Sequence, residues 1–218
     1  MPVSELHREV AAIALRAAAR HGFALGGGNA LIAYGITERP TQDVDVFSDE
    51  EGGVEAAADA VETALRDAGF ETERLDEASG LGDIFDGMGE CLAEWIIAAP
   101  GGEQTMLQMA YFDRARRPVT MDFGPVLDLE DVVGGKVCAL ASRAEPRDYL
   151  DTAAALDRYS MGQVIGFARR LDPGLTDRDF ADAGRRLDQW GDGVFGPFGL
   201  SPRDVARLRE RFADWPRT

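Results

Sequence analysis

The hydrophobic pattern of the chain changes its period partway along, and this change limits the folds that the chain can adopt. Up to about residue 125, short segments of alternating apolar and polar residues are interspersed with amphipathic helical segments. From Leu129 onward the pattern is helical to the end of the chain. The sequence therefore predicts an α+β protein: a mixed sheet flanked by helices over residues 1–125, followed by a helical portion over residues 126–218.

Local signals place the individual segments of the first part. Ser4 can cap a helix that runs to about Arg20, and a second amphipathic helix is predicted over Val54–Ala68. Strands are expected at residues 23–25, 43–47, 70–75, 95–99, 105–112 and 119–123, with a hairpin turn at residues 100–103. Residues 76–90 are rich in glycine and acidic residues and show no clear period.

Charge and composition exclude several classes of protein. A net charge of −16 argues against broad nucleic-acid binding, because phosphate backbones are bound by surplus Lys and Arg. No apolar run approaches the roughly 20 residues of a membrane helix, and the N-terminus lacks a signal peptide, so we expect a cytoplasmic protein. Reduced thiols are expected at Cys91 and Cys138, and solvated positions at His7 and His21, which argues against a zinc site.

A glycine-rich turn is the first candidate for a binding site. Gly26, Gly27 and Gly28 precede Asn29, which is predicted to begin a short helix ending at Tyr34. Glycines have no Cβ, so their backbone N–H groups can approach phosphate oxygens, and the partial positive charge of a helix N-terminus favours phosphate. The segment lacks the Gly-Lys-Ser/Thr of a Walker A loop. An ordinary turn is the alternative interpretation.

Two aspartates follow at the start of an apolar strand. Alternation places Asp43, Asp45 and Phe47 on one face of this strand and two valines on the other. Carboxylates about 7 Å apart, from the rise per residue of a strand, suit a shared Mg²⁺ or Mn²⁺ ion that would relieve their repulsion. The alternative is a solvated strand end.

A second block of sequence carries a further motif. Residues 129–151 fit the pattern L-x-D-x-x-x-x-K-x-x-A-L-x-x-R-x-x-x-R-D-x-x-D. Taken with "GGNAL" and "TQDVDVF", this order of motifs resembles the nucleotidyltransferase AbiEii/AbiGii toxin family over roughly residues 23–156. The resemblance implies the nucleotidyltransferase superfamily fold and Mg²⁺-dependent transfer of a nucleotide from a nucleoside triphosphate. It also implies a tRNA acceptor and an antitoxin protein partner, within bacterial type IV toxin–antitoxin systems.

The family motif assigns roles to residues of both parts of the chain. By resemblance, Asp43, Asp45, Lys136 and Asp148 are catalytic, and the nucleotide is bound by Gly27, Gly28, Asn29, Lys136 and Arg143. Helical spacing places Lys136 and Arg143 on one face, and Pro146 is expected to separate that helix from the next. The alternative is a salt-bridged helical hairpin in which Arg147, Asp148 and Asp151 only cap and pair.

Two departures from the family pattern affect these roles. Asn29 stands where Ser or Thr is usual, and its amide can still form a hydrogen bond to phosphate. The third carboxylate of the superfamily is assigned to Asp122, which would complete the metal site with Asp43 and Asp45. Asp113 is the rival for this position.

The acceptor and even the activity have alternatives. The acidity of the chain argues against tRNA, although Arg114, Arg116 and Arg117 form a local basic cluster. A small molecule or a protein is the alternative acceptor. A catalytically idle domain that binds a nucleotide or a partner protein is a further alternative, as is a purely structural protein.

Overall fold

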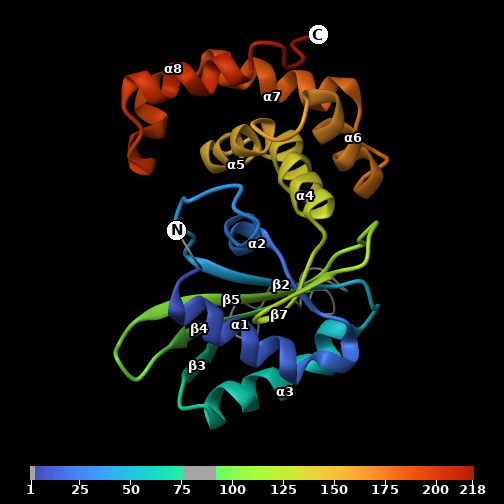
Figure 1. Ribbon diagram of the computed structural model, residues 1–218, viewed down its shortest axis with the longest axis vertical. Coiled ribbons are helices and arrows are strands. Elements are labelled where there is room, and N and C mark those ends of the chain that lie inside the picture. Colours follow the sequence, from blue (N-terminus) through green and yellow to red (C-terminus); the bar gives the residue numbers. More distant parts are fainter. Residues whose placement is uncertain (1–2, 76–91) are drawn as a thin grey trace. The chain divides into compact units, whose positions relative to one another are not determined.

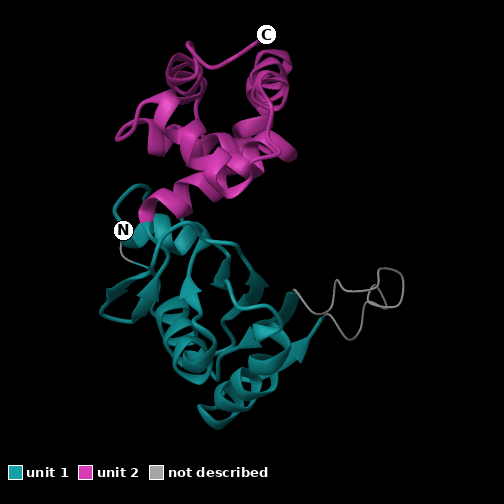
Figure 2. Cartoon of the chain, turned by 90° about the vertical axis from the view of Figure 1, so that its right-hand side faces the viewer, with its two compact units in different colours: residues 1–128 teal, residues 129–218 magenta. Residues whose placement is uncertain are grey.

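The computed structural model describes residues 3–75 and 92–218. The chain divides into two compact units, residues 1–128 and residues 129–218, which are coloured separately in Figure 2. Unit 1 contains a mixed sheet with flanking helices, and unit 2 is helical, which confirms the predicted α+β class (Figure 1). Residues 76–90 and Cys91 lie outside the described residues.

The described strands of unit 1 form one sheet with the order β3-β4-β5-β2-β1-β7-β6. Their bounds are Ala24–Leu25 (β1), Asp43–Ser48 (β2), Glu71–Arg74 (β3), Leu92–Ala98 (β4), Gln104–Tyr111 (β5), Val119–Met121 (β6) and Gly124–Val126 (β7). The pairs β2–β5 and β1–β7 are parallel, and the other neighbouring pairs are antiparallel. The predicted hairpin is confirmed as β4–β5, with Gly102 at a positive φ of 87° in its turn.

The helices of unit 1 are α1 (Glu5–Ala17), η1 (Ala19–His21), α2 (Gly27–Ala33) and α3 (Gly53–Asp67). Ser4 caps α1 as predicted, because its side chain accepts a hydrogen bond from the backbone N–H of His7. α1 and α3 lie on the same side of the sheet (Figure 1). Their apolar residues cover the side of β2 that carries the fully buried Val44 and Val46.

The other face of β2 carries the predicted site residues. Asp43, Asp45 and Phe47 are half-buried and alternate with the buried valines, which confirms the predicted alternation of this strand. Pairing with β5 places Met106 beside Asp43 and Gln108 beside Asp45. The sheet thus presents a partly accessible polar face at the start of β2.

Unit 2 consists of α4 (Leu129–Ser142), α5 (Pro146–Leu156), α6 (Met161–Leu171), α7 (Asp177–Gln189), η3 (Asp192–Phe198) and α8 (Pro202–Arg211). Pro146 begins α5, as predicted, because its fixed φ suits the first turn and its missing N–H needs no partner there. Capping boxes begin α6, α7 and α8. The core includes Tyr149, whose ring packs against Trp190 and Phe212 and whose hydroxyl donates to the Ala183 carbonyl over 2.7 Å.

Among residues 3–75 and 92–218, every helix is too short or too polar to cross a membrane.

Candidate functional site

The glycine-rich turn of unit 1 is hydrogen-bonded to Asp45, the second aspartate of β2. The backbone N–H of Gly26 donates to the carbonyl of Asp45 over 2.8 Å. Gly27 has a positive φ of 57°, and a Cβ at this position would lie 1.6 Å from Asp45 Oδ2. Only glycine allows the turn to approach the carboxylate this closely. The glycine-rich turn and the Asp45 side chain therefore pack directly against each other.

The neighbouring glycines are also held close to β2 and its approach. A Cβ at Gly26 would lie 2.4 Å from the ring of Phe47, and one at Gly28 would lie 3.1 Å from the side chain of Thr41. Thr41 in turn donates its hydroxyl to Asp43 Oδ1 over 2.7 Å. The helix α2 begins at Gly27, two positions before the predicted start at Asn29.

The side-chain amide of Asn29 is not exposed, as the predicted contact with phosphate would require. Its side chain is fully buried, and Nδ2 donates to the backbone carbonyl of Asp43 over 2.7 Å. Its Oδ1 lies 3.2 Å from His7 Nδ1. Because the amide is engaged on both sides, a contact from Asn29 to phosphate would have to come from its backbone N–H.

The expectation that His7 is solvated is wrong. Its ring is only 7% exposed and lies between Asn29 and Thr105, with Nε2 3.0 Å from Thr105 Oγ1. The helical period of α1 turns this position inward although the residue type is polar. His21 is more accessible and lies 3.3 Å from Glu50 Oε1.

The structure does not bring Asp122 to the two aspartates of β2. Asp122 is exposed in the turn between β6 and β7, and β7 is separated from β2 by β1. The registers Leu25↔Val46 and Leu25↔Val126 place the start of β7 at the Ser48 end of the sheet. Asp122 is thus roughly 15 Å or more from Asp43 along the strand direction, by the rise per residue.

The rival Asp113 is also at the far end of the sheet. It follows Tyr111, which pairs with Ser48 at the end of β2 opposite Asp43. In the described part of the chain, no group of three or more His, Cys, Asp or Glu side chains is arranged to hold a metal ion. Among the described residues, the carboxylates that this face of β2 offers to a cation are those of Asp43 and Asp45.

Two polar residues that no motif identified lie level with Asp45 on the neighbouring strands β5 and β4. Gln108 lies beside Asp45 in the register, and Glu94 lies beside Gln108 on the next strand. Gln108 Nε2 donates to Glu94 Oε1 over 2.6 Å. A single polar residue inside an apolar stretch of each strand was the available signal, but the alignment of these residues with Asp45 depends on strand pairing.

Unit 2 contains the other predicted site residues, and each has an oppositely charged partner. Lys136 Nζ lies 3.1 Å from Asp151 Oδ2, with the two side chains 20% and 1% exposed. Arg143 donates to both oxygens of Asp148, over 3.0 and 2.9 Å. The hydrogen bonds to Asp148 raise the pKa of Arg143, which keeps the guanidinium charged.

The alternative of a salt-bridged hairpin describes these contacts well. Asp148 also accepts from the backbone N–H of Glu145 at the start of α5, and Arg147 Nε lies 3.0 Å from Glu145 Oε2. Capping and pairing thus account for the geometry within unit 2. A nucleotide-binding role for Lys136, Arg143 and Asp148 stays a prediction from the family motif.

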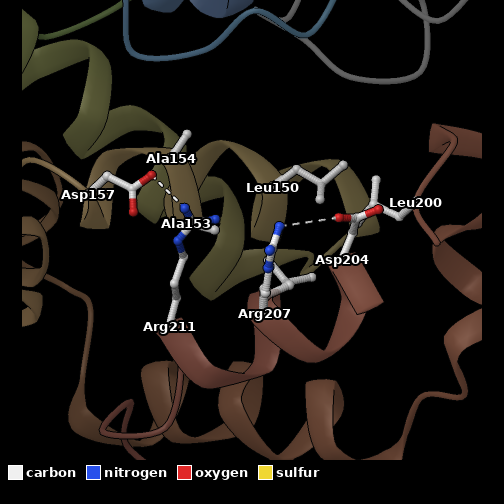
Figure 3. A pocket seen from close by; sticks show the side chains of 9 residues that line it. Leu150, Ala153, Ala154, Asp157, Leu200, Asp204, Arg207 and Arg211 are labelled. Atoms are coloured by element: carbon white, nitrogen blue, oxygen red, sulfur yellow. Dashed lines mark hydrogen bonds and ion pairs between the residues drawn. The ribbon is translucent and has the colours of Figure 1, made fainter. Parts of the chain in front are cut away.

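Other features of unit 2 are outside the predicted site. Burial raises the pKa of the Cys138 thiol to about 11, so it is not a thiolate nucleophile at neutral pH. A pocket of about 280 Å³ lies between α5 and α8 (Figure 3). Its two arginines are paired with its two aspartates, Arg211 with Asp157 and Arg207 with Asp204. None of the predicted site residues lines this pocket.

The chain was compared with known proteins. A model of the family described as "Nucleotidyl transferase AbiEii toxin, Type IV TA system" matches residues 10–217. This match includes the helical residues 157–217, in which inspection of the sequence found no motif. No protein with curated annotation matches the chain.

Several solved structures share the fold. The crystal structure of JHP933 from Helicobacter pylori is similar with a TM-score of 0.59 and 14% identity, covering 96% of this chain and 91% of that chain. A putative nucleotidyltransferase from H. pylori gives 0.59 and 14%, covering 95% and 93%. The nucleotidyltransferase toxin MenT4 (Rv2826c) from Mycobacterium tuberculosis H37Rv gives 0.54 and 15%, covering 95% and 82%.

Proposed function

The chain belongs to the AbiEii family of nucleotidyl transferase toxins, and from this premise we propose that it transfers a nucleotide from a nucleoside triphosphate to a hydroxyl acceptor with the help of Mg²⁺. The observation that carries the proposal is the joining of the glycine-rich turn to the aspartates of β2. A Cβ at position 27 would overlap the Asp45 carboxylate, so any larger residue would displace it. Such a turn can present backbone N–H groups to a phosphate that shares a cation with Asp43 and Asp45.

The donor set of β2 is suitable for Mg²⁺ bound together with a triphosphate. Mg²⁺ prefers oxygen ligands and is commonly bound by one or two carboxylates plus phosphate oxygens and water. Asp43 and Asp45 would supply the two carboxylates, and the hydroxyl of Thr41 orients one of them. When bound, the ion supplies positive charge that stabilises the transferring phosphoryl group. The proposal uses two carboxylates, because Asp122 and Asp113 are at the opposite end of the sheet.

The remaining charge of the triphosphate needs protein cations. Lys136 is proposed to neutralise it, with Arg143 as a second cation and Asp148 as the residue that orients Arg143. This assignment rests on the order of motifs in the family. It requires Lys136 to exchange its contact with Asp151 for one with phosphate, which an ammonium on a flexible stem can do.

In the proposed reaction the acceptor hydroxyl oxygen forms a bond to the α-phosphorus, and the bond to the bridging oxygen of pyrophosphate breaks. The hydroxyl proton passes to a base, and pyrophosphate carries away the electron pair of the broken bond. Because both carboxylates of β2 are assigned to the cation, solvent water is the proposed proton acceptor. We propose tRNA as the acceptor and an antitoxin protein as a partner, as the family resemblance implies.

A net charge of −16 favours a narrow RNA contact or a different acceptor. The experiment that tests the function would incubate the protein with each α-labelled nucleoside triphosphate, Mg²⁺ and total bacterial RNA. We expect label in a tRNA-sized species with one preferred nucleotide. Label in protein or in a small molecule would identify that molecule as the acceptor in place of tRNA. No incorporation with any acceptor would contradict the proposed transfer.

A second function is favoured by one observation. Since no third carboxylate joins Asp43 and Asp45 among the described residues, a domain that binds nucleotide without transferring it is also consistent with the site. Such a domain would be stabilised against heat by Mg²⁺ and a nucleoside triphosphate but would incorporate no label. The same preparations can therefore distinguish the two functions.

A further inference from the structure

His7 is a buried polar residue of unit 1, and the proposed mechanism assigns no role to it. It projects from α1 into the space between α2 and β5, where Asn29 and Thr105 are its hydrogen-bonding neighbours. Both of these residues also contact β2, the strand that carries the aspartates. Asn29 donates to the backbone carbonyl of Asp43, and Thr105 Oγ1 lies 3.0 Å from the backbone carbonyl of Gln42.

The direction of these hydrogen bonds can be assigned from the chemistry of the groups. The Asn29 amide nitrogen faces a carbonyl and must be the donor, which leaves its Oδ1 as an acceptor. His7 Nδ1, 3.2 Å from that oxygen, must then carry a proton. Thr105 donates its single hydroxyl proton to the carbonyl of Gln42, and its Oγ1 lies 3.0 Å from His7 Nε2. The imidazole thus joins two side chains that each donate to a carbonyl at the start of β2.

This chain of contacts ends at two successive carbonyls at the start of β2. Asn29 lies on α2 and Thr105 on β5, so the imidazole connects the elements that flank this part of the strand. The backbone of residues 42 and 43 determines where the Asp43 carboxylate projects. Buried polar networks of this kind specify one arrangement, whereas an apolar side chain would fill the same space without fixing direction.

We infer that His7 is a positioning residue of the Asp43–Asp45 site, which fixes the Asp43 backbone through Asn29 on one side and Thr105 on the other. The inference rests on the proposed function only for its consequence in binding and transfer. The hydrogen-bond network is a property of the protein alone.

Two conservative variants separate the contact of His7 with Asn29 from its contact with Thr105. In His7→Asn the amide nitrogen occupies the place of Nδ1, so the donor to Asn29 is kept and the contact with Thr105 is lost. In His7→Gln the amide reaches the place of Nε2, so the contact with Thr105 is kept and the donor to Asn29 is lost. Because Asn29 holds Asp43 itself, we expect His7→Gln to be the more harmful change.

The kinetic test compares incorporation of labelled nucleotide by these variants with the wild type. We expect kcat to fall on the order of tenfold in His7→Gln, with a smaller change in KM for the nucleotide and a partial recovery in His7→Asn. Val61→Ala, in the buried face of α3, is the matched control for a general loss of stability. Equal kcat in His7→Gln and in a Val61→Ala protein of the same thermal stability would overturn the inference.

A spectroscopic test does not depend on activity. The chain has two histidines, so the ring nitrogen resonances of His7 can be followed by NMR with His21 as the exposed reference. We expect the ring nitrogen resonances of His7, but not those of His21, to change on adding Mg²⁺ with a non-hydrolysable nucleoside triphosphate analogue. Unchanged His7 resonances in a protein that binds the analogue would overturn the inference.

The outcomes distinguish a failure of this inference from a failure of the proposed function. If the wild type neither binds the analogue nor transfers nucleotide, the proposed function fails and the positioning role falls with it. If the wild type does both and His7→Gln matches it, only the role of His7 is overturned.

Discussion

The start of β2 in unit 1 and the α4–α5 hairpin in unit 2 carry the two halves of the predicted site, and they handle charge in opposite ways. On β2, Asp43 and Asp45 place two charges of the same sign on one face of a strand. In the hairpin, Lys136 is beside Asp151, and Arg143 is beside Asp148. The first arrangement brings charges of one sign together on a strand, and the second pairs opposite charges within the hairpin.

This difference indicates how function and stability are distributed between the two regions. Removing one of two like charges relieves repulsion, so changes on β2 should affect ligand binding more than folding. Removing one member of a buried ion pair leaves a charge without its partner, so changes in the hairpin should affect folding as well. Experiments that measure both quantities can therefore test the contrast.

The largest effect is expected from Asp45→Asn. The amide keeps the shape that fits against Gly27 but loses the charge that would hold Mg²⁺. We expect a loss of nucleotide transfer on the order of 10³-fold, equivalent to several kcal/mol of transition-state stabilisation. Stability without ligand should change by less than about 1 kcal/mol, while the rise in melting temperature with Mg²⁺ and nucleoside triphosphate should disappear.

Asp67→Asn, at the exposed end of α3, removes the same charge from unit 1 and serves as the control. It should retain both transfer and the ligand-induced rise in melting temperature. An undiminished rise in Asp45→Asn would place the metal elsewhere and remove the contrast between the two regions.

The next effect concerns Lys136 and separates its two proposed roles. Lys136→Ala leaves the buried Asp151 carboxylate without its ammonium partner, and we expect a loss of roughly 3 kcal/mol in the free energy of unfolding. Transfer should also fall on the order of 10²-fold if the ammonium stabilises the triphosphate. Lys136→Arg should recover only part of the rate, because a planar guanidinium does not place a point charge in the same position.

A double variant decides whether this loss of rate is a consequence of misfolding. Adding Asp151→Asn to Lys136→Ala removes the unpaired charge and should restore most of the stability. If transfer stays low in the stable double variant, Lys136 acts on the nucleotide. If transfer returns with stability, Lys136 is a structural residue and the hairpin only supports the fold.

A smaller effect is expected from the glycine-rich turn. In Gly27→Ala the new methyl group would collide with Asp45 Oδ2, and the residue would have to keep a positive φ. We expect affinity for Mg²⁺ with nucleotide to fall about tenfold, because the carboxylate must move. Gly69→Ala is the matched control, since this glycine also has a positive φ, of 92°, but its methyl group would meet nothing within 4 Å. Equal binding by both variants would show that the turn has no role beyond reversing the chain.

The smallest effect is expected from Asp122→Asn. Its side chain is exposed in the β6–β7 turn, and the strand registers place it at the opposite end of the sheet from Asp43. Transfer should stay within about twofold of the wild type, and stability within about 0.5 kcal/mol. A large loss of transfer would contradict this placement and would show that Asp122 is the third carboxylate that the superfamily pattern implies.

Much of the fold could be predicted because local patterns are strong in this chain. The alternation of Asp43 and Asp45 with buried valines, the hairpin at residues 100–103 and the start of α5 at Pro146 are all signals within a few residues. His7 was misplaced because residue type outweighed helical position in the prediction. Its ring is buried, and its partners on α2 and β5 are far away in the sequence.

The candidate site was predictable only in part, for a related reason. The motifs identify residues by type and order, which suffices for Asp43, Asp45 and the glycines. Assigning a third carboxylate requires knowing which strands are neighbours. Asp122 was expected on a strand with the same alternation as β2, but it lies in the β6–β7 turn, and β1 and β7 separate this turn from the aspartates. Gln108 and Glu94, which carry no motif, are the residues aligned with Asp45.

The sequence by itself determined the α+β class, the family, and the face of β2 that carries the aspartates, because these follow from periods and motifs along the chain. The tertiary structure decided which side chains meet: Gly27 with Asp45, His7 with Asn29 and Thr105, and Lys136 with Asp151. The physical reason is that periodicity is set by backbone geometry within one element, whereas a contact between elements depends on strand order, register and packing across long stretches of chain.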